Sequence, residues 1–259
     1  MPDPVAQPVL YDSIGTGYAE RRQPDPRISE ALRSALGDAR QIVNVGAGAG
    51  SYEPVEITAA AVEPSAVMAA QRPPPLVPAV LSSAEQLPFV DEAFDGALAV
   101  LTIHHWGDAA RGLRELRRVT AGPIVILTFD PEVFSSWWLP AEYAPELRPL
   151  AFEDAPELDL LRSELSCARI TVLPVPARCR DGFLMAFWDR PELVLDPSAR
   201  AATSGFARLS DLVQQRICER LSADLRSGRW DERYGYLREL SEFDSGLRLV
   251  VAPGAHAAD

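Results

Sequence analysis

Three glycines at alternate positions, Gly46, Gly48 and Gly50, follow directly after the β-branched run 41–45. Glycine suits a turn that a ligand approaches closely, because a Cβ would block the backbone there. A strand followed by such a turn is the first half of a nucleotide-binding unit. Glu63 ends the next predicted strand, 17 residues after Gly46, where a carboxylate can accept hydrogen bonds from both hydroxyls of a ribose. These four residues predict a nucleotide-like ligand at the ends of two neighbouring strands.

Two adjacent histidines, His104 and His105, follow the predicted strand 95–102. An imidazole with its ordinary pKa of about 6.5 can take a proton from a hydroxyl, an amine, an indole or an acidic carbon. Neighbouring residues of a strand point to opposite faces, so we expect at most one of the two to face a reacting group. The alternative for each is a histidine that packs in the fold.

Alternating strands and helices must position these residues. The apolar runs predict strands at 41–45, 57–62, 79–82, 95–102 and 123–129. Helical spacing predicts helices at 27–36, 67–71 and 109–118. Such an alternation is typical of an α/β fold with a mostly parallel sheet.

The pattern loosens after residue 130. We expect helices at 158–165, 183–188 and 209–227 and two further strands at 170–175 and 247–251. About 70 residues separate these last two strands, more than an ordinary connection requires, which indicates a cap over the sheet. The whole pattern predicts a Rossmann-like, seven-stranded, mostly parallel sheet with helices on both faces and a helical cap.

This pattern divides the chain into three parts. Residues 1–25 form an N-terminal arm that closes over the ligand, and residues 26–130 form the ligand-binding core. Residues 131–259 complete the sheet and contain the inserted cap, at roughly 131–165 and 178–240.

The composition limits the class of partner. Lys+Arg is 25 and Asp+Glu is 37, which gives a net charge of −12, and every one of those cations is arginine. This acidic balance argues against a nucleic acid or an anionic membrane surface and favours a small-molecule partner. No apolar run is long enough to span a membrane, and the N-terminus lacks the pattern of a signal peptide. Three widely spaced cysteines, Cys167, Cys179 and Cys218, predict reduced thiols in a cytoplasmic protein, with neither a disulfide framework nor a metal cluster. The oligomeric state is left open between a monomer and a homodimer.

Six segments in order resemble the class I S-adenosylmethionine-dependent methyltransferases, in the small-molecule and ubiquinone/menaquinone-like subgroup. They are VNVGAGAG (43–50), AVEPS (61–65), AEQLPF (84–89), FDGALAVLTIHHW (94–106), GLRELRRV (112–119) and IVILTF (124–129). The resemblance covers about half of the chain. It implies that the nucleotide-like ligand is S-adenosylmethionine (SAM), which becomes S-adenosylhomocysteine (SAH).

The resemblance also implies which residues bind the cofactor. The backbone around Gly46 and Gly48 would face the methionine portion and the ribose of SAM, and Glu63 would bind the ribose hydroxyls. The other expected contacts are Ala47 in the glycine turn, Pro64 and Ser65 flanking the adenine, Ala84 and Glu85 along its edge, and Leu101 and Thr102 beside the sulfonium.

Three departures from the family pattern alter these expectations. The family usually has an acid where this chain has Asn44, so the contact to the amino group of the cofactor is expected to be weaker or made by another residue. Ser83 replaces a usual aspartate near the adenine. Only 13 positions separate Gly50 from Glu63, which leaves little room for the usual first helix. We expect the N-terminal arm to fill that gap, with Tyr18 and Arg22 reaching the carboxylate of SAM, because arginine binds a carboxylate in bidentate fashion. Packing of Tyr18 and solvation of Arg22 is the equal alternative.

For catalysis, the resemblance favours His105 as the base facing the acceptor, with His104 packed under the following helix. Methyl transfer from a sulfonium is an in-line displacement, so positioning should supply most of the rate enhancement. Aromatic side chains in the segments expected to cover the site could stack on a planar acceptor: Phe129, Trp137, Trp138, Tyr143, Phe183 and Phe187. Packing in the core of the cap is the alternative for each of them.

Three other functions stay open at this point. The departures at Asn44 and Ser83 are compatible with a methyltransferase-like protein that binds the cofactor without turnover. A dinucleotide-dependent oxidoreductase is disfavoured because its G-x-G-x-x-G motif needs a glycine where this chain has Ser51. An RNA methyltransferase is disfavoured by the negative charge.

Overall fold

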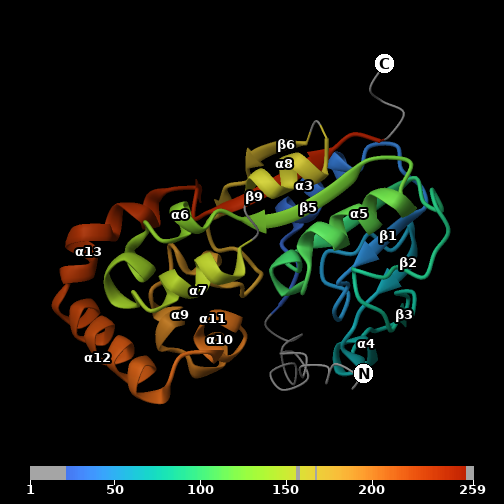
Figure 1. Ribbon diagram of the computed structural model, residues 1–259. Helices are drawn as coiled ribbons and strands as arrows, with labels where there is room; N and C mark the ends of the chain where they lie inside the picture. The colour runs from blue at the N-terminus through green and yellow to red at the C-terminus, as the bar shows by residue number, and fades with distance from the viewer. Residues whose placement is uncertain (1–21, 156–157, 167, 255–259) are drawn as a thin grey trace.

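A seven-stranded sheet in the order β3-β2-β1-β4-β5-β9-β6 forms the centre of the protein (Figure 1). The computed structural model describes residues 22–155, 158–166 and 168–254. β9 runs antiparallel to its neighbours β5 and β6, and the other neighbouring strands are parallel. The strands are β1 (Ile42–Val45), β2 (Thr58–Val62), β3 (Ala79–Val80), β4 (Gly96–Val100), β5 (Ile124–Phe129), β6 (Arg169–Val172) and β9 (Leu247–Ala252). The predicted fold class is confirmed.

Helices cover both faces of this sheet. α3 (Pro26–Ala35) packs on one face, and α5 (Ala109–Val119) and α8 (Leu158–Glu164) pack on the other. The residues of β5 alternate between the two cores, as the pleat of a strand requires. Val125 and Leu127 lie in the core beneath α3, whereas Ile124 and Ile126 lie in the core beneath α5.

Aspartates begin the two long helices of this region. Asp25 accepts a hydrogen bond from the backbone N–H of Arg27 at 3.0 Å, with Pro26 in the first turn. The Arg27 side chain also donates to Asp25 and holds the pKa of that buried carboxyl down at about 2. Asp108 caps α5 in the same way, accepting from the N–H of Arg111 at 2.9 Å.

Between β1 and β2 the described chain forms turns and no helix. Tyr52 takes a left-handed backbone conformation there, with φ 63°. Its ring is buried in the core beneath α3, and its hydroxyl oxygen accepts from the N–H of Asp25 at 3.3 Å. Tyr52 thus joins the turn after β1 to the start of α3.

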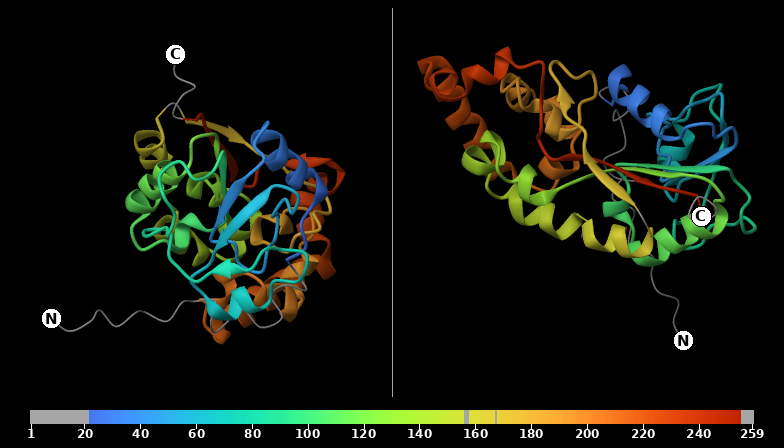
Figure 2. Two further views of the ribbon diagram at one scale, coloured as in Figure 1. Left: turned by 90° about the vertical axis from the view of Figure 1, so that its right-hand side faces the viewer. Right: turned by 90° about the horizontal axis from the view of Figure 1, so that it is seen from above.

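A helical cap lies beside the sheet, at the end where β5 continues into α6 (Figures 1 and 2). It is built from two stretches of chain, one after β5 and one between β7 (Val175–Pro176) and β8 (Glu242–Phe243), which pair as a small separate sheet. Its elements are α6 (Pro131–Phe134), the π-helix η2 (Leu139–Tyr143), α7 (Leu147–Asp154), η3 (Leu184–Phe187), α9 (Glu192–Leu195), α10 (Pro197–Ala201), α11 (Ser204–Ala207), α12 (Asp211–Ser227), α13 (Arg229–Tyr234) and η4 (Gly235–Glu239).

Large aromatic residues fill the core of the cap. The ring centroids of Trp138 and Trp230 are 5.5 Å apart, edge to face. The indole N–H of Trp138 donates to the carbonyl of Trp188 at 2.8 Å. The hydroxyl of Tyr143 donates to the buried carboxylate of Asp224 at 2.9 Å. These contacts join the first stretch of the cap to the second.

Two predicted elements differ from the structure. The apolar run 183–188 contains a short 3₁₀ helix, η3, in place of a regular helix. The expected strand 170–175 is divided, because β6 ends at Val172 and Val175 pairs with β8 instead.

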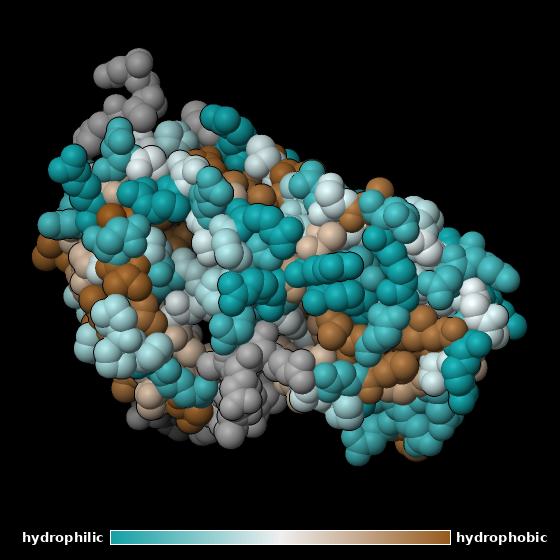
Figure 3. All heavy atoms as spheres, turned by 180° about the vertical axis from the view of Figure 1, so that it is seen from behind, coloured by the Kyte–Doolittle hydropathy of each residue, from teal (hydrophilic) through white to brown (hydrophobic). Residues whose placement is uncertain are grey.

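The surface reflects the composition. Hydrophilic residues cover most of the middle of the face opposite to Figure 1 (Figure 3). In the described part of the chain, no helix has both the length and the apolar character needed to cross a bilayer.

Candidate active site

The glycine-rich turn begins at the carboxyl end of β1. Gly46 and Gly48 both have left-handed conformations, with φ 69° and 52°. A Cβ on Gly46 would lie 1.9 Å from the Oγ1 of Thr102, so this glycine lets Thr102 pack against the turn. A Cβ on Gly48 would meet only the Cε of Met68, at 3.5 Å. Gly48 therefore leaves its outer side open for a ligand to approach.

Glu63 stands at the end of β2 beside this turn. Its side chain is buried, with the residue 7% exposed. One carboxylate oxygen accepts from the N–H of Gly48 and the other from the N–H of Ser65, both at 2.8 Å. A carboxylate has about four acceptor positions, so an oriented carboxylate at this place is suited to hydroxyl donors of a ribose.

A polar network lies directly under the turn. Asn44 of β1 donates its side-chain N–H to Glu53 at 2.8 Å. Glu53 in turn forms an ion pair with Arg72 at 2.6 Å. The family usually has an acid at position 44. In this chain position 44 is an amide, and the acid beside it is Glu53, which lies in the turn after β1.

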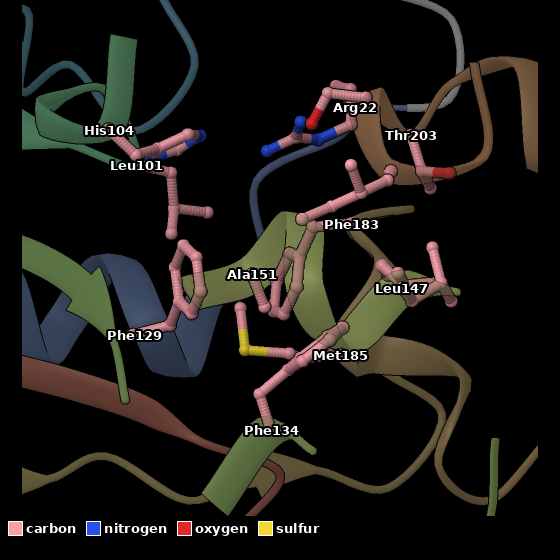
Figure 4. Close-up of a pocket in the computed structure, with 14 residues that line it drawn as sticks. Arg22, Leu101, His104, Phe129, Phe134, Leu147, Ala151, Phe183, Met185 and Thr203 are labelled. Carbon is pink, nitrogen blue, oxygen red and sulfur yellow. The ribbon is translucent and has the colours of Figure 1, made fainter. Parts of the chain in front are cut away.

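A cavity opens at the carboxyl ends of β4 and β5, between the sheet and the cap (Figure 4). It has a volume of about 670 Å³, including space open to solvent. Leu101, His104 and Phe129 form the sheet side. The remaining lining residues are Arg22, Phe134, Leu147, Leu150, Ala151, Phe183, Leu184, Met185, Thr203, Ser204 and Gly205.

The two histidines lie in a 3₁₀ helix, η1 (Ile103–His105), not at the end of a strand as predicted. β4 ends at Val100, and Leu101 then takes a left-handed conformation with φ 49°. This turn aims His104 into the cavity, where its ring lies edge-on to Phe129 with 5.6 Å between centroids. His104, which was expected to pack away, lines the cavity, and His105 does not. Which of the two faces the acceptor stays a prediction.

The pKa values of both imidazoles are lowered. Burial lowers the pKa of His104 well below 6.5, helped by His105 and the positive charge of Arg22. The surrounding protein, Arg208 and Arg22 lower the pKa of His105 to about 4, although this residue is exposed in part. The Nδ1 of His104 is buried and has no hydrogen-bond partner within the described residues. A neutral ring with such a nitrogen can accept a proton or a hydrogen bond from a molecule in the cavity.

Arg22 forms part of the cavity wall, with its guanidinium pointing toward His104 (Figure 4). It pairs with the fully buried Asp181 at 2.6 Å. Its backbone carbonyl accepts from the hydroxyl of Ser51 at 3.4 Å. Arg22 is therefore placed between the glycine-rich turn and the cap. Tyr18, its expected companion at the cofactor, lies outside the described residues.

The other residues expected at the cofactor lie along the same edge of the sheet. Ala47 is buried in the turn, Pro64 is exposed, and Ser65 caps the short helix α4 (Ala66–Ala70) by accepting from Met68 at 3.2 Å. Thr102 packs on Gly46 and Leu101 lines the cavity. Ala84 is buried under α5, and Glu85 accepts from the N–H of Asp108 at 3.2 Å.

Of the six aromatic residues expected to touch the acceptor, Phe129 and Phe183 line the cavity. Trp137, Trp138, Tyr143 and Phe187 belong instead to the buried core of the cap and do not line this cavity. They pack inward with other large apolar residues of the cap, such as Trp188, Phe206 and Trp230. The lining residues from α7 and α11, such as Leu147 and Ser204, could not be predicted from the sequence, since no motif marks them.

Comparison with known proteins gives the family. Residues 43–122 match a family model described as a methyltransferase domain. A crystal structure from Anabaena variabilis ATCC 29413, of a protein assigned as a methyltransferase from an antibiotic biosynthesis pathway, is 33% identical. The similarity covers 90% of this chain and 98% of that one, with a TM-score of 0.83. The chain belongs to the class I SAM-dependent methyltransferases.

Two further proteins resemble this chain, one in sequence and one in fold. A malonyl-[acyl-carrier protein] O-methyltransferase from Halorhodospira halophila is 27% identical over 165 residues, 56% of this chain. The match spans only about half of that protein, 55% of its length. A geranyl diphosphate C-methyltransferase from Streptomyces coelicolor, crystallised with SAH, shares the fold at 13% identity with a TM-score of 0.51, over 96% of this chain and 100% of that one.

The cofactor of this methyltransferase is SAM, and the residues around the glycine-rich turn fit it. The open side of Gly48 and the oriented carboxylate of Glu63 meet at the sheet edge where the family binds its cofactor. The family membership decides against the dinucleotide-dependent oxidoreductase.

Proposed function

We propose that this methyltransferase acts on a small molecule whose apolar body lies in the cavity between the sheet and the cap. The observation that supports this proposal is the composition and place of the cavity wall. Leu101 and His104 follow β4, next to the glycine-rich turn, and the cap supplies apolar groups such as Phe183 and Met185. An acceptor held there would lie beside the donor end of the cofactor site.

The chain contributes positioning and a proton acceptor. SAM, when bound, supplies a methyl group on a positively charged sulfur, which is a good leaving group. The apolar walls orient the acceptor and exclude water, and holding the two reactants in line is the larger part of the catalysis. We propose that the neutral imidazole of His104 accepts the proton of the acceptor, and that Gly46, Ala47, Gly48, Glu63 and Ser65 hold the cofactor.

The contacts of Arg22 support the proposal that the N-terminal arm, residues 1–25, closes over the cofactor site. The described end of the arm already bridges the two halves of the site, since Arg22 contacts Ser51 of the glycine-rich turn and Asp181 of the cap. We propose that Tyr18 and Arg22 close the cofactor site, with residues 26–130 as the cofactor-binding core. Stretches within 131–165 and 178–240 form the substrate cap.

The net charge of −12 supports a small molecule over a nucleic acid as the acceptor. The name of the Halorhodospira relative supports an oxygen of a carboxyl group as one acceptor class to test. The aromatic walls Phe129 and Phe183 support a planar, aromatic acceptor as another.

A panel of phenols, aromatic amines and aliphatic carboxylic acids, each incubated with SAM, tests the proposal through release of SAH. For an acceptor that turns over, Ala151→Phe should fill the cavity and raise the acceptor KM by about tenfold or more, since lost pocket contacts cost ~1–3 kcal/mol. The Kd of SAH, measured by calorimetry, should stay within about twofold. Leu212→Phe is the matched control, because Leu212 is 80% exposed on α12.

His104→Ala and His105→Ala compare the two histidines in the same assay. A general base contributes ~10²–10⁴-fold, so His104→Ala should lower kcat by that order with little change in SAH affinity. His105→Ala should lower kcat less.

For the cavity itself, an Ala151→Phe variant with an unchanged acceptor KM and kcat would place the acceptor outside this cavity.

A further inference from the structure

A buried ion pair supports the glycine-rich turn from below. The side chains of Glu53 and Arg72 are 0% and 2% exposed, and the two charged groups are 2.6 Å apart. A charged pair this far from solvent costs desolvation free energy and is weak evidence of a gain in stability. Its other contacts therefore matter for what it does.

Arg72 links the acid to the backbone of the turn. One guanidinium nitrogen binds Glu53, and another lies 3.4 Å from the carbonyl oxygens of both Ala47 and Gly48. The Nε donates to the carbonyl of Val77 at 3.0 Å, which fixes the guanidinium against the segment just before β3. Two consecutive carbonyls of the turn are therefore directed toward one buried cation.

This arrangement also orients the amides of the turn. With the carbonyls of residues 47 and 48 directed toward Arg72, the N–H of Gly48 is on the side of Glu63, to which it donates at 2.8 Å. The same segment has its left-handed conformations at Gly46 and Gly48. The position of the amides and of the Glu63 carboxylate thus depends on where Arg72 is held.

Asn44 completes the network with a neutral side chain. It donates to Glu53 at 2.8 Å and is itself buried. A carboxylate at position 44 in addition to Glu53 would place two buried acids around one guanidinium, at a cost from like-charge repulsion. β1 therefore supplies the amide, Asn44, and the turn after it supplies the acid, Glu53.

We propose that Glu53 and Arg72 are positioning residues for cofactor binding: a buried ion pair that sets the glycine-rich turn, in which Asn44 and Glu53 divide the roles of amide and acid. The proposal rests on binding of SAM at this turn and is independent of the acceptor. It predicts that the acid can be moved between the two positions without loss of cofactor affinity.

The exchange is tested by Asn44→Asp, Glu53→Gln and the double variant. Each single change should weaken SAH binding by about tenfold or more, a difference of ~1.4 kcal/mol in binding free energy, because it leaves one unbalanced buried charge. The double variant restores one acid and one amide, so its Kd should return to within about threefold of the original. Calorimetry with SAH measures this without any acceptor, so failure of the proposed acceptor site would not affect the result.

A neutral replacement separates positioning from stability. Glu53→Gln combined with Arg72→Met removes both charges, which for a buried pair is often neutral for folding. We expect a midpoint of thermal unfolding close to the original, a raised Kd for SAH and a raised KM for SAM, with kcat at saturating SAM nearly unchanged. Glu56→Gln, which breaks the exposed pair of Glu56 with Arg33, is the control that should change neither.

Two results would overturn the proposal. One is normal SAH affinity in the neutral double variant, which would reduce the pair to a structural contact. The other is a loss in the exchanged variant equal to the sum of the losses in the two single variants, which would show that the positions are not coupled. If the neutral variant does not fold, the exchanged variant decides by itself.

Discussion

Glu63 is the side chain that we propose to bind the ribose of the cofactor. It is buried, and backbone N–H groups of Gly48 and Ser65 hold both of its oxygens. Hydrogen bonds to a charged group contribute about 1.5–3 kcal/mol each. We therefore expect Glu63→Ala to weaken SAH binding by about tenfold to a hundredfold or more while the chain still folds.

Calorimetry with SAH measures this loss, and circular dichroism checks the fold. Glu56→Ala is the matched control, because this glutamate is exposed and lies outside the site. An unchanged Kd in Glu63→Ala would remove Glu63 from the cofactor site.

At the scale of single residues, the positions of the glycines and of Glu63 could be predicted, because their spacing after two strands permits few other arrangements. They lie at the ends of β1 and β2 as expected, and their binding of the cofactor stays a prediction. The orientation of His104 could not be found, since it depends on the left-handed Leu101 and the 3₁₀ turn that follows. Arg72 could not be found either, because its partner Glu53 is 19 positions away and reaches it only through the fold.

The glycine-rich turn is the element whose two glycines have different tasks. Gly46→Ala would place a Cβ 1.9 Å from Thr102 and hold an L-residue at φ 69°. We expect it to lower the free energy of unfolding by about 2 kcal/mol or more, as overpacking and left-handed strain both contribute. Gly48→Ala carries only the strain, about 1 kcal/mol, but its methyl group would occupy the side open to the cofactor.

Urea unfolding and SAH calorimetry on both variants separate these effects. We expect Gly46→Ala to lose more free energy of unfolding than Gly48→Ala. In Gly48→Ala, the loss of SAH affinity should be large compared with its small loss of stability. Equal stability losses in the two variants would contradict the close packing of Thr102 on Gly46.

Among the elements, those from residue 26 to residue 129 could be predicted to within a few positions at their ends. Their strands are apolar on both faces, and helices α3 and α5 carry aspartate caps. The cap was predicted as helical but not in its parts. Its helices from α9 to α11 have four or five residues each, too short for a helical period to emerge, and tertiary packing determines them.

The free energy of unfolding of the whole molecule should depend on pH, and we expect His104 to contribute to that dependence. The pKa of His104 is lowered in the folded chain and ordinary in the unfolded chain. The unfolded chain therefore binds more protons below pH 6.5, and the folded state loses stability as the pH falls through that value. Each such group contributes a slope of about 1.4 kcal/mol per pH unit in that range.

Denaturant unfolding at pH 7.0, 6.0 and 5.5 measures the slope. His104→Gln, which cannot gain the proton, should have a shallower decline than the original chain by about one group's contribution. The same slope in both would show that His104 is protonated in the folded state at these pH values.

The order of the sheet has a consequence for how the chain is made. β9 fills the place between β5 and β6, yet it follows the entire second stretch of the cap along the chain. During synthesis, β5, β6 and the helices up to η4 leave the ribosome before the strand that joins them. Until β9 arrives, two strand edges face each other across an open slot, and such edges pair readily with foreign strands. The nascent chain is therefore prone to aggregation until residues 247–252 emerge and pair with β5 and β6. A chaperone that covers these two strand edges would protect the chain during that period.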